Sequence, residues 1–274
     1  MLKIKMISKK RIILFLLGFL SLIIGFILNE NAAGGGRQDF LYFFPYIEGF
    51  SENLLNGFEN YIKNPAVSIQ PPTYYIFAGF ISGSLGGIFG FKILYLMLSL
   101  FLPYIFFIIL KEKFNQNSDL IFYLSLLIFI SPYFRTSAIW SLGENLSLIF
   151  FGLFVYNLIK GQKSFKIKYY LYSLIFLIIC SYIRHYYSVF WFFYIFVYFN
   201  NFKFKYLPHI LALSLFSSIP AIIYFSNLIF TENYLSVIKD YTNFNIFFQI
   251  IQISTIILFY LIPFILFCRE KLNN

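Results

Sequence analysis

Charged residues are scarce in this chain of 274 residues: 12% are Asp, Glu, Lys or Arg, whereas 60% are hydrophobic. Soluble domains carry about 25% charged residues and about 45–50% apolar ones. A water-soluble core of this size has no room for such an apolar excess, so lipid is expected to solvate much of the surface. The composition therefore predicts an all-α membrane protein that crosses the bilayer several times.

Cysteine is also rare, and the common motifs of soluble enzymes are missing. Cys180 and Cys268 fall near the ends of different apolar runs, at opposite predicted membrane faces, so no disulfide is expected between them. The sequence contains no Walker loop, no Gly-x-Ser-x-Gly and no His-Glu-x-x-His. The net charge of +10 comes from short basic clusters between apolar runs, which fix membrane topology and do not indicate a nucleic-acid partner.

Long apolar runs and the basic clusters between them together predict the topology. The apolar runs cover about residues 12–28, 74–89, 91–110, 120–133, 141–159, 169–183, 186–200, 207–230 and 245–267. If residues 74–89 lie along the outer interface or re-enter, 15 of the 21 Lys and Arg residues fall on one side, which is then the cytoplasm. This bias predicts about eight transmembrane helices with both ends in the cytoplasm, in a single domain over residues 1–274.

The first outward loop, residues 29–73, is the longest and begins with two candidate site residues. Gly34, Gly35 and Gly36 provide a backbone that can turn sharply and approach a ligand closely. Arg37 and Asp39 follow at once, so a phosphate-binding cation and a general base stand side by side in the sequence. A solvated Arg–Asp surface pair is the alternative interpretation.

An amphipathic helix is expected further along the same loop. Its apolar positions recur at steps of three and four residues, which is typical of a helix at the outer interface or on the bundle. These positions are Ile47, Phe50, Leu54, Phe58 and Tyr61. The segment 74–89 follows two adjacent prolines and contains Gly and Ser near its end, which favours an interfacial or re-entrant element over a continuous span.

Four more ionisable residues fall at predicted outer ends of spans. Arg135 and Glu144 belong to the connection after residue 130, and Arg184 and His185 stand between two apolar runs with almost no loop. Ionisable groups at that depth are costly, so each is a functional candidate. The Arg residues could hold a lipid phosphate and His185 could serve in acid–base chemistry, whereas interfacial anchoring is the alternative for all four.

Several of these segments resemble a known family in their order along the chain. A first span, an outer loop with an early Asp39, a Pro71-Pro72-Thr73-Tyr74-Tyr75 segment and Glu144 at the start of a later span are similar to the GT-C superfamily of membrane glycosyltransferases. The similarity is to its bacterial protein-mannosyltransferase and aminoarabinose-transferase branch. Gln70 stands where that branch has a His before the two prolines. The Ile183-Arg184-His185 stretch is loosely similar to an Ile-Arg-Gln element of dolichol-linked glucosyltransferases.

The resemblance implies an enzyme of the bacterial inner membrane that makes cell-envelope glycans. Its donor would be a sugar on a polyprenyl phosphate at the outer face, and its acceptor a glycan, a lipid or a protein. Asp39 and Glu144 would be catalytic, and Arg37, Arg135, Arg184 and His185 would bind the donor phosphate. A divalent cation held by Asp39 and Glu144 is left open.

Two other functions fit a polytopic protein that handles lipid-linked sugars. A polysaccharide polymerase is expected to have more spans and a large loop late in the chain, whereas the long loop here comes first. A lipid-linked sugar flippase or transporter should place polar residues near the bilayer midplane, whereas the charged residues here lie at the ends of runs. The sequence therefore favours chemistry at the outer surface.

Overall fold

The computed structural model describes residues 9–64, 70–114 and 118–229, and every regular element within them is a helix. The chain divides into two compact units, Met1–Tyr224 and Phe225–Asn274, and nearly all described residues belong to the first. The predicted last span, 245–267, and Cys268 lie outside the described residues. The all-α fold class is confirmed for the described part of the chain.

Three helical stretches are long and apolar enough to cross a bilayer: Lys9–Ile27, Ile88–Phe114 and Leu207–Tyr224. A fourth candidate forms if Asp119–Ile130 and Pro132–Ile139, which meet at an angle of 63°, count as one broken span. The structure thus supports a protein with several membrane-crossing helices. Eight spans with both ends in the cytoplasm remain a prediction.

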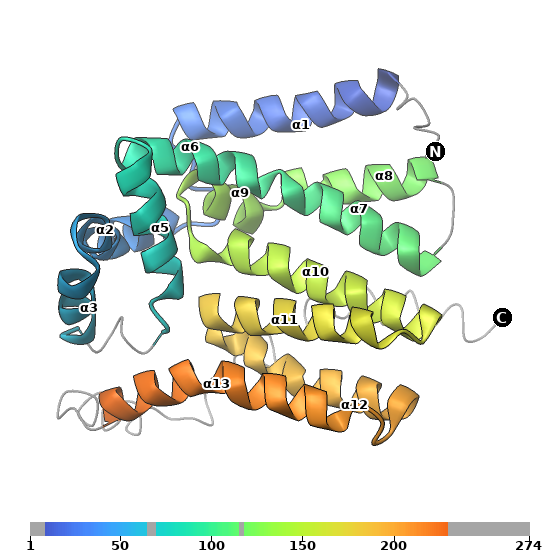
Figure 1. Cartoon of the computed structure of the whole chain (residues 1–274). Coiled ribbons are helices and arrows are strands. Elements are labelled where there is room, and N and C mark those ends of the chain that lie inside the picture. The colour runs from blue at the N-terminus through green and yellow to red at the C-terminus, as the bar shows by residue number, and fades with distance from the viewer. Residues whose placement is uncertain (1–8, 65–69, 115–117, 230–274) are drawn as a thin grey trace, which may run out of the picture. The chain divides into compact units, whose positions relative to one another are not determined.

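The long helices of the first unit run roughly along one direction, while a short helix crosses them at one end (Figure 1). The aligned helices include α1 (Lys9–Ile27), α7 (Phe101–Phe114), α10 (Gly143–Ser164), α11 (Ile167–Ile183) and, up to Tyr224, α13 (Leu207–Ile229). The crossing helix is α5 (Thr73–Ser84), which packs on α2 (Gly36–Glu52). Helix α10 lies between α7 and α11 and contacts both (Figure 1).

The amphipathic pattern of the first loop forms two helices where the sequence predicted one. Helix α2 ends at Glu52, and α3 (Leu54–Ile62) begins after Asn53, whose side chain accepts hydrogen bonds from the amides of Leu55 and Asn56. Such an N-cap starts a new helix and changes the chain direction. Ile47 and Phe50 are buried, yet Leu54 is half exposed, so the apolar faces of the two helices do not form one stripe.

The segment predicted as interfacial or re-entrant becomes α5 and the start of α6 (Ile88–Ser99). With 12 residues, α5 is about 18 Å long, which is too short to cross a hydrocarbon core of about 30 Å. Gly86 and Gly87 separate the two helices with φ values of 73° and 107°, a conformation that favours glycine. A non-spanning α5 is consistent with the predicted topology.

The connection predicted as a short outer loop, residues 131–140, is a buried helix. Helix α9 (Pro132–Ile139) begins at Ser131, which caps the amide of Phe134, and most of its side chains are buried. Its polar residues predicted exposure, but their side chains bond to the turns before α2 and α10: Arg135 to Glu30, Thr136 to Ala33 and Ser137 to Leu142. This helix brings the connection into the protein, where it contributes to the candidate site.

Candidate functional site

The two predicted catalytic carboxylates line the same cavity, which we call the carboxylate cavity. It has a volume of about 570 Å³ and includes Asp39, from the first turn of α2, and Glu144, from the first turn of α10. The remaining lining comes largely from α9 and from the α8 (Ser118–Leu126) to η1 (Leu127–Ile130) segment. Phe106 of α7 and Tyr187 also line the cavity, which therefore joins residues from segments far apart in the chain.

A glycine turn fixes the start of α2 against α9. Gly34 and Gly35 both have a φ of 71°, which only glycine adopts without strain, as the sequence predicted for this turn. Gly36 lies so close to Thr136 that a Cβ atom would overlap its methyl group. The amide of Ala33 donates to Thr136 Oγ1 over 2.9 Å. Asp39 is thereby placed one turn into a helix that is anchored to α9.

Two tyrosine hydroxyls fasten the turn that precedes Glu144. Tyr74, in the Pro-Pro-Thr-Tyr-Tyr segment, donates to the carbonyl oxygen of Ser141, and Tyr95 donates to that of Leu142. The Tyr95 hydroxyl also accepts from the amide of Leu146 at 3.1 Å. Both tyrosine side chains are buried, so these bonds form away from water. The motif that carried the family resemblance therefore positions the start of α10.

Asn145 adds a second set of bonds at the same helix start. Its amide nitrogen Nδ2 donates to Ser99 Oγ at 3.2 Å and to the carbonyl oxygen of Phe134 at 3.0 Å, while its backbone amide donates to Ser137 Oγ. Sequence reasoning named Tyr74 only as part of the segment 71–75 and did not single out Asn145 or Tyr95. The position of Asn145 next to Glu144 was a signal, whereas Tyr95 lies inside an apolar run and carried none.

Arg184 is the most deeply buried cation near the cavity and is paired with Glu144. It ends α11, its exposed fraction is 8%, and its Nη2 lies 2.5 Å from Glu144 Oε1. Its Nη1 donates to the side-chain oxygen of Gln70. A buried guanidinium needs such partners, because an unpaired charge away from water is costly. Arg184 itself does not line the carboxylate cavity, so it acts there through Glu144.

Gln70 is the residue that sequence reasoning noted only as a departure from the family. Its carbonyl oxygen accepts from the hydroxyls of Tyr61, at 2.7 Å, and Tyr224, at 3.3 Å. These bonds hold the residue just before Pro71 while its side chain contacts Arg184. Three segments far apart in the sequence therefore meet in one hydrogen-bonded chain, Gln70–Arg184–Glu144.

Some polar atoms in this cluster have no hydrogen-bond partner among the described residues. They are the Tyr75 hydroxyl, Arg184 Nε, Glu144 Oε2 and Ser141 Oγ, all of them buried. Buried polar groups are usually paired, and exceptions often occur at functional sites. Within the described residues, these atoms of the cluster behind Glu144 therefore remain available to hydrogen-bond to a ligand or to water.

Arg135 is paired with Glu30 and fastens the end of α1 to α9. Its Nε lies 2.6 Å from Glu30 Oε1, its Nη2 pairs with Oε2 of the same carboxylate, and its Nη1 donates to Ser21 Oγ at 2.9 Å. The hydrogen bonds from Arg135 hold the pKa of the Glu30 carboxyl below its usual value. These contacts indicate a structural role for Arg135, one that the sequence did not reveal.

Arg37 and His185 lie at the surface. Both are exposed, and within the described part of the chain neither lines the carboxylate cavity. His185 begins the short helix η2 (His185–Val189), with its ring 6.3 Å from that of Tyr186. Arg37 belongs to the same helical turn as Asp39 and, among the described residues, forms no ion pair. Among the four predicted phosphate-binding residues, Arg37 is therefore the one that shares a helical turn with a cavity carboxylate and forms no ion pair within the described residues.

The cavity wall has a polar and an apolar part. Its polar part contains the two carboxylates with Ser131, Thr136 and Ser137. Its apolar part contains Phe106, Leu124, Leu127, Ile128 and Leu148. Helix α2 begins here without a side-chain cap, and uncapped helix N-termini attract anions, whereas the first-turn amides of Asn145 and Leu146 in α10 are already bonded to Ser137 and Tyr95. The cavity can therefore receive a molecule that has an anionic head and an apolar tail.

A metal centre made only of protein side chains is not present in the described part of the chain. No three His, Cys, Asp or Glu side chains gather there closely enough to hold an ion. Asp39 and Glu144 would have to share a cation with oxygen atoms of a substrate or with water.

Comparison of the chain with protein-family models, with curated proteins and with solved structures finds no match.

Proposed function

We propose that this protein is a glycosyltransferase of a bacterial inner membrane. It transfers a sugar from a polyprenyl-phosphate-linked donor to an acceptor at the outward face. The observation that carries the proposal is the shared cavity of Asp39 and Glu144, with an apolar wall beside the two carboxylates. A base for the acceptor, the uncapped start of α2 for a phosphate and a surface for a lipid tail meet in that one place.

The apolar wall favours a lipid-linked donor over a soluble nucleotide sugar. Phe106, Leu124 and Leu127 come from helical segments that are apolar enough to lie in the bilayer. A polyprenyl chain can lie against these side chains while its phosphate reaches the start of α2. Arg37, exposed in that first turn, adds a cation that can bond to phosphate oxygens.

The proposed reaction is a single displacement at the anomeric carbon. The oxygen of the acceptor hydroxyl forms a bond to that carbon, the bond from carbon to the phosphate oxygen breaks, and the phosphate leaves with the electron pair. Asp39 accepts the proton of the acceptor hydroxyl. Because attack comes from the face opposite the leaving phosphate, the product has inverted anomeric configuration.

Glu144 and Arg184 have different tasks in this proposal. Glu144 faces the cavity and contacts the substrate sugar or acceptor, whereas Arg184 holds the carboxylate in place from behind. Gln70 fixes the other side of the Arg184 guanidinium. Arg184 is thus a positioning residue, and the donor phosphate meets instead the start of α2, the helical turn to which Arg37 belongs.

The proposal is tested with the purified full-length chain in liposomes. Synthetic polyprenyl-phosphate monosaccharides, each with a labelled sugar, are supplied together with lipid, glycan and peptide acceptors. The expected result is release of polyprenyl phosphate that matches the label gained by an acceptor. Movement of the labelled donor between leaflets with no release of polyprenyl phosphate would instead identify a flippase and overturn the proposal.

A further inference from the structure

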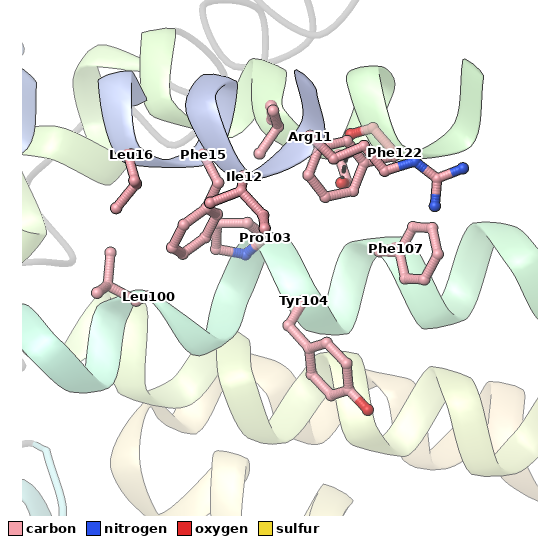
Figure 2. A pocket seen from close by; sticks show the side chains of 11 residues that line it. Arg11, Ile12, Phe15, Leu16, Leu100, Pro103, Tyr104, Phe107 and Phe122 are labelled. Carbon is pink, nitrogen blue, oxygen red and sulfur yellow. Dashed lines mark hydrogen bonds between the residues drawn. The ribbon is translucent and has the colours of Figure 1, made fainter. Parts of the chain in front are cut away.

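A second hollow lies between α1, α7 and α8, and we call it the apolar groove (Figure 2). It has a volume of about 380 Å³, which is within the range of small-molecule pockets, roughly 300–1,000 Å³. Its lining residues are Arg11, Ile12, Phe15, Leu16, Leu100, Pro103, Tyr104, Phe107, Phe122, Ser125 and Leu126. None of these residues lines the carboxylate cavity.

The groove is apolar along its length and has a charge at one end. Figure 2 shows Phe15 and Leu16 of α1 opposite Leu100, which lies between α6 and α7, and Pro103 of α7, with Arg11 toward the other end of the groove. The Tyr104 hydroxyl points away from α1 in this view. Both walls belong to stretches that are long and apolar enough to cross a bilayer, so the surrounding solvent is acyl chain. An unbranched hydrocarbon chain matches such a lining.

The charged end of the groove belongs to a basic rim. Lys9 and Lys10, exposed at the start of α1, adjoin Arg11, and Lys111 and Lys113 occupy the last turn of α7. Both helix ends lie on the same side of the bundle (Figure 1). The acidic residues at this end are Asp119, 2.5 Å from Arg11, and Glu112, 3.5 Å from Lys163. The rim therefore keeps an excess of positive charge.

We propose that the apolar groove binds one acyl chain of an anionic phospholipid, whose phosphate headgroup meets this basic rim. Basic rims beside grooves between transmembrane helices attract the anionic lipids of the cytoplasmic leaflet. The predicted topology places the start of α1 on that leaflet, which is the leaflet opposite the proposed transfer reaction. The bound lipid fills the space between α1 and α7 and ties α1 to the bundle. This inference does not depend on the proposed function.

The test uses the wild-type chain in nanodiscs that contain phosphatidylglycerol or phosphatidylcholine with a photoactivatable group near the end of one acyl chain. After irradiation, peptide mass spectrometry locates the adducts. We expect adducts on Leu16, Pro103 and Phe107, with phosphatidylglycerol favoured by about fivefold or more, because one basic residue near the surface already gives that factor. Equal yields from both lipids, or adducts spread evenly over the exposed Leu215 and Phe216 of α13, would overturn the proposal.

Two matched pairs of variants separate the tail site from the headgroup site. Leu16→Trp fills the groove and should abolish the groove adducts, whereas Leu215→Trp, on an exposed face of α13, should leave them unchanged. Lys10→Gln with Lys111→Gln should remove most of the preference for phosphatidylglycerol, whereas Lys203→Gln with Lys205→Gln should not. Loss of the preference in both double variants would indicate general surface charge and contradict a specific lipid site.

Discussion

The Arg184 guanidinium lies 2.5 Å from the Glu144 carboxylate, and this ion pair joins the end of α11 to the start of α10. Gln70 contacts the same guanidinium from the segment before α5. Glu144 lines the carboxylate cavity and Arg184 does not, so the ion pair links the cavity wall to residues outside it. The position of one predicted catalytic carboxylate is therefore set by two segments that are distant from it in the sequence.

Removing the cation should destabilise the protein more than removing both partners. Arg184→Met leaves Glu144 without its partner and should lower the free energy of unfolding by about 1–3 kcal/mol. The cost should be below that of a fully buried pair, because the Glu144 side chain is 46% exposed. Adding Glu144→Gln should recover part of the loss. Thermal unfolding in detergent measures both variants, with the exposed Arg37→Met as control. Additive losses in the double variant would show that the pair is not coupled.

Removing the hydroxyl of Tyr74 or of Tyr95 should lower kcat, although neither side chain lines the carboxylate cavity. Tyr74→Phe leaves the buried carbonyl oxygen of Ser141 without its donor, and Tyr95→Phe removes the acceptor of the Leu146 amide while Ser137 still donates to Leu142, each at a cost of about 1–3 kcal/mol. The turn that aims Glu144 then loosens. We expect kcat to fall in Tyr74→Phe and Tyr95→Phe while Tyr172→Phe, half exposed on α11, behaves as wild type. Unchanged kcat in both variants would separate the turn from the reaction.

Acid should weaken the link between α1 and α9. The pKa of Glu30 is lowered by its hydrogen bonds with Arg135, so this carboxylate stabilises the fold above its unfolded pKa of about 4.3. That contribution is lost as the pH falls through the lowered folded pKa. Wild type should therefore exceed Glu30→Gln in Tm by a constant amount above about pH 5, and the difference should shrink below pH 4. Glu48→Gln, exposed on α2, is the control. A Tm difference that persists unchanged at pH 3 would contradict the pairing.

The predicted topology can be checked with single cysteines in a background without Cys180 and Cys268. A membrane-impermeant maleimide should label Ser51→Cys and Asn233→Cys in intact cells. Lys113→Cys and Lys163→Cys should react only after the membrane is opened. Labelling of Lys113→Cys from outside would place another span before α7 and overturn the interpretation of residues 74–89 as a segment that does not cross.

The two carboxylates of the candidate site could be singled out from the sequence because each leaves a local signal. Asp39 follows a run of glycines, and Glu144 begins an apolar run; the structure places both beside one cavity. The helical class follows from composition alone. The sharp turn at the glycines was predicted as well, because glycine is the residue that adopts a positive φ, as Gly34 and Gly35 do, with the least strain.

The contacts that set the roles of the arginines could not be predicted in the same way. Arg135 bonds to Glu30 across 105 residues of sequence and Arg184 to Gln70 across 114, and no local pattern reports such distances. Sequence reasoning expected an anion near each cation at this depth. For Arg135 and Arg184, the described structure supplies that anion from the protein's own carboxylates. The burial of α9 was missed because its polar residues predict a surface loop.

The central claim is that Asp39 removes the acceptor proton in a lipid-linked sugar transfer. Asp39→Asn keeps the shape of the side chain and removes the base, so kcat for sugar transfer should fall by about 100-fold or more, while the affinity for the donor remains within a few fold of wild type. Glu48→Gln, which removes an exposed carboxylate from the same helix, should leave both quantities unchanged. The decisive measurement is the rate of polyprenyl phosphate release by Asp39→Asn at saturating donor. A collapse of this rate with donor binding retained is the predicted result, and a rate near that of wild type would contradict the account.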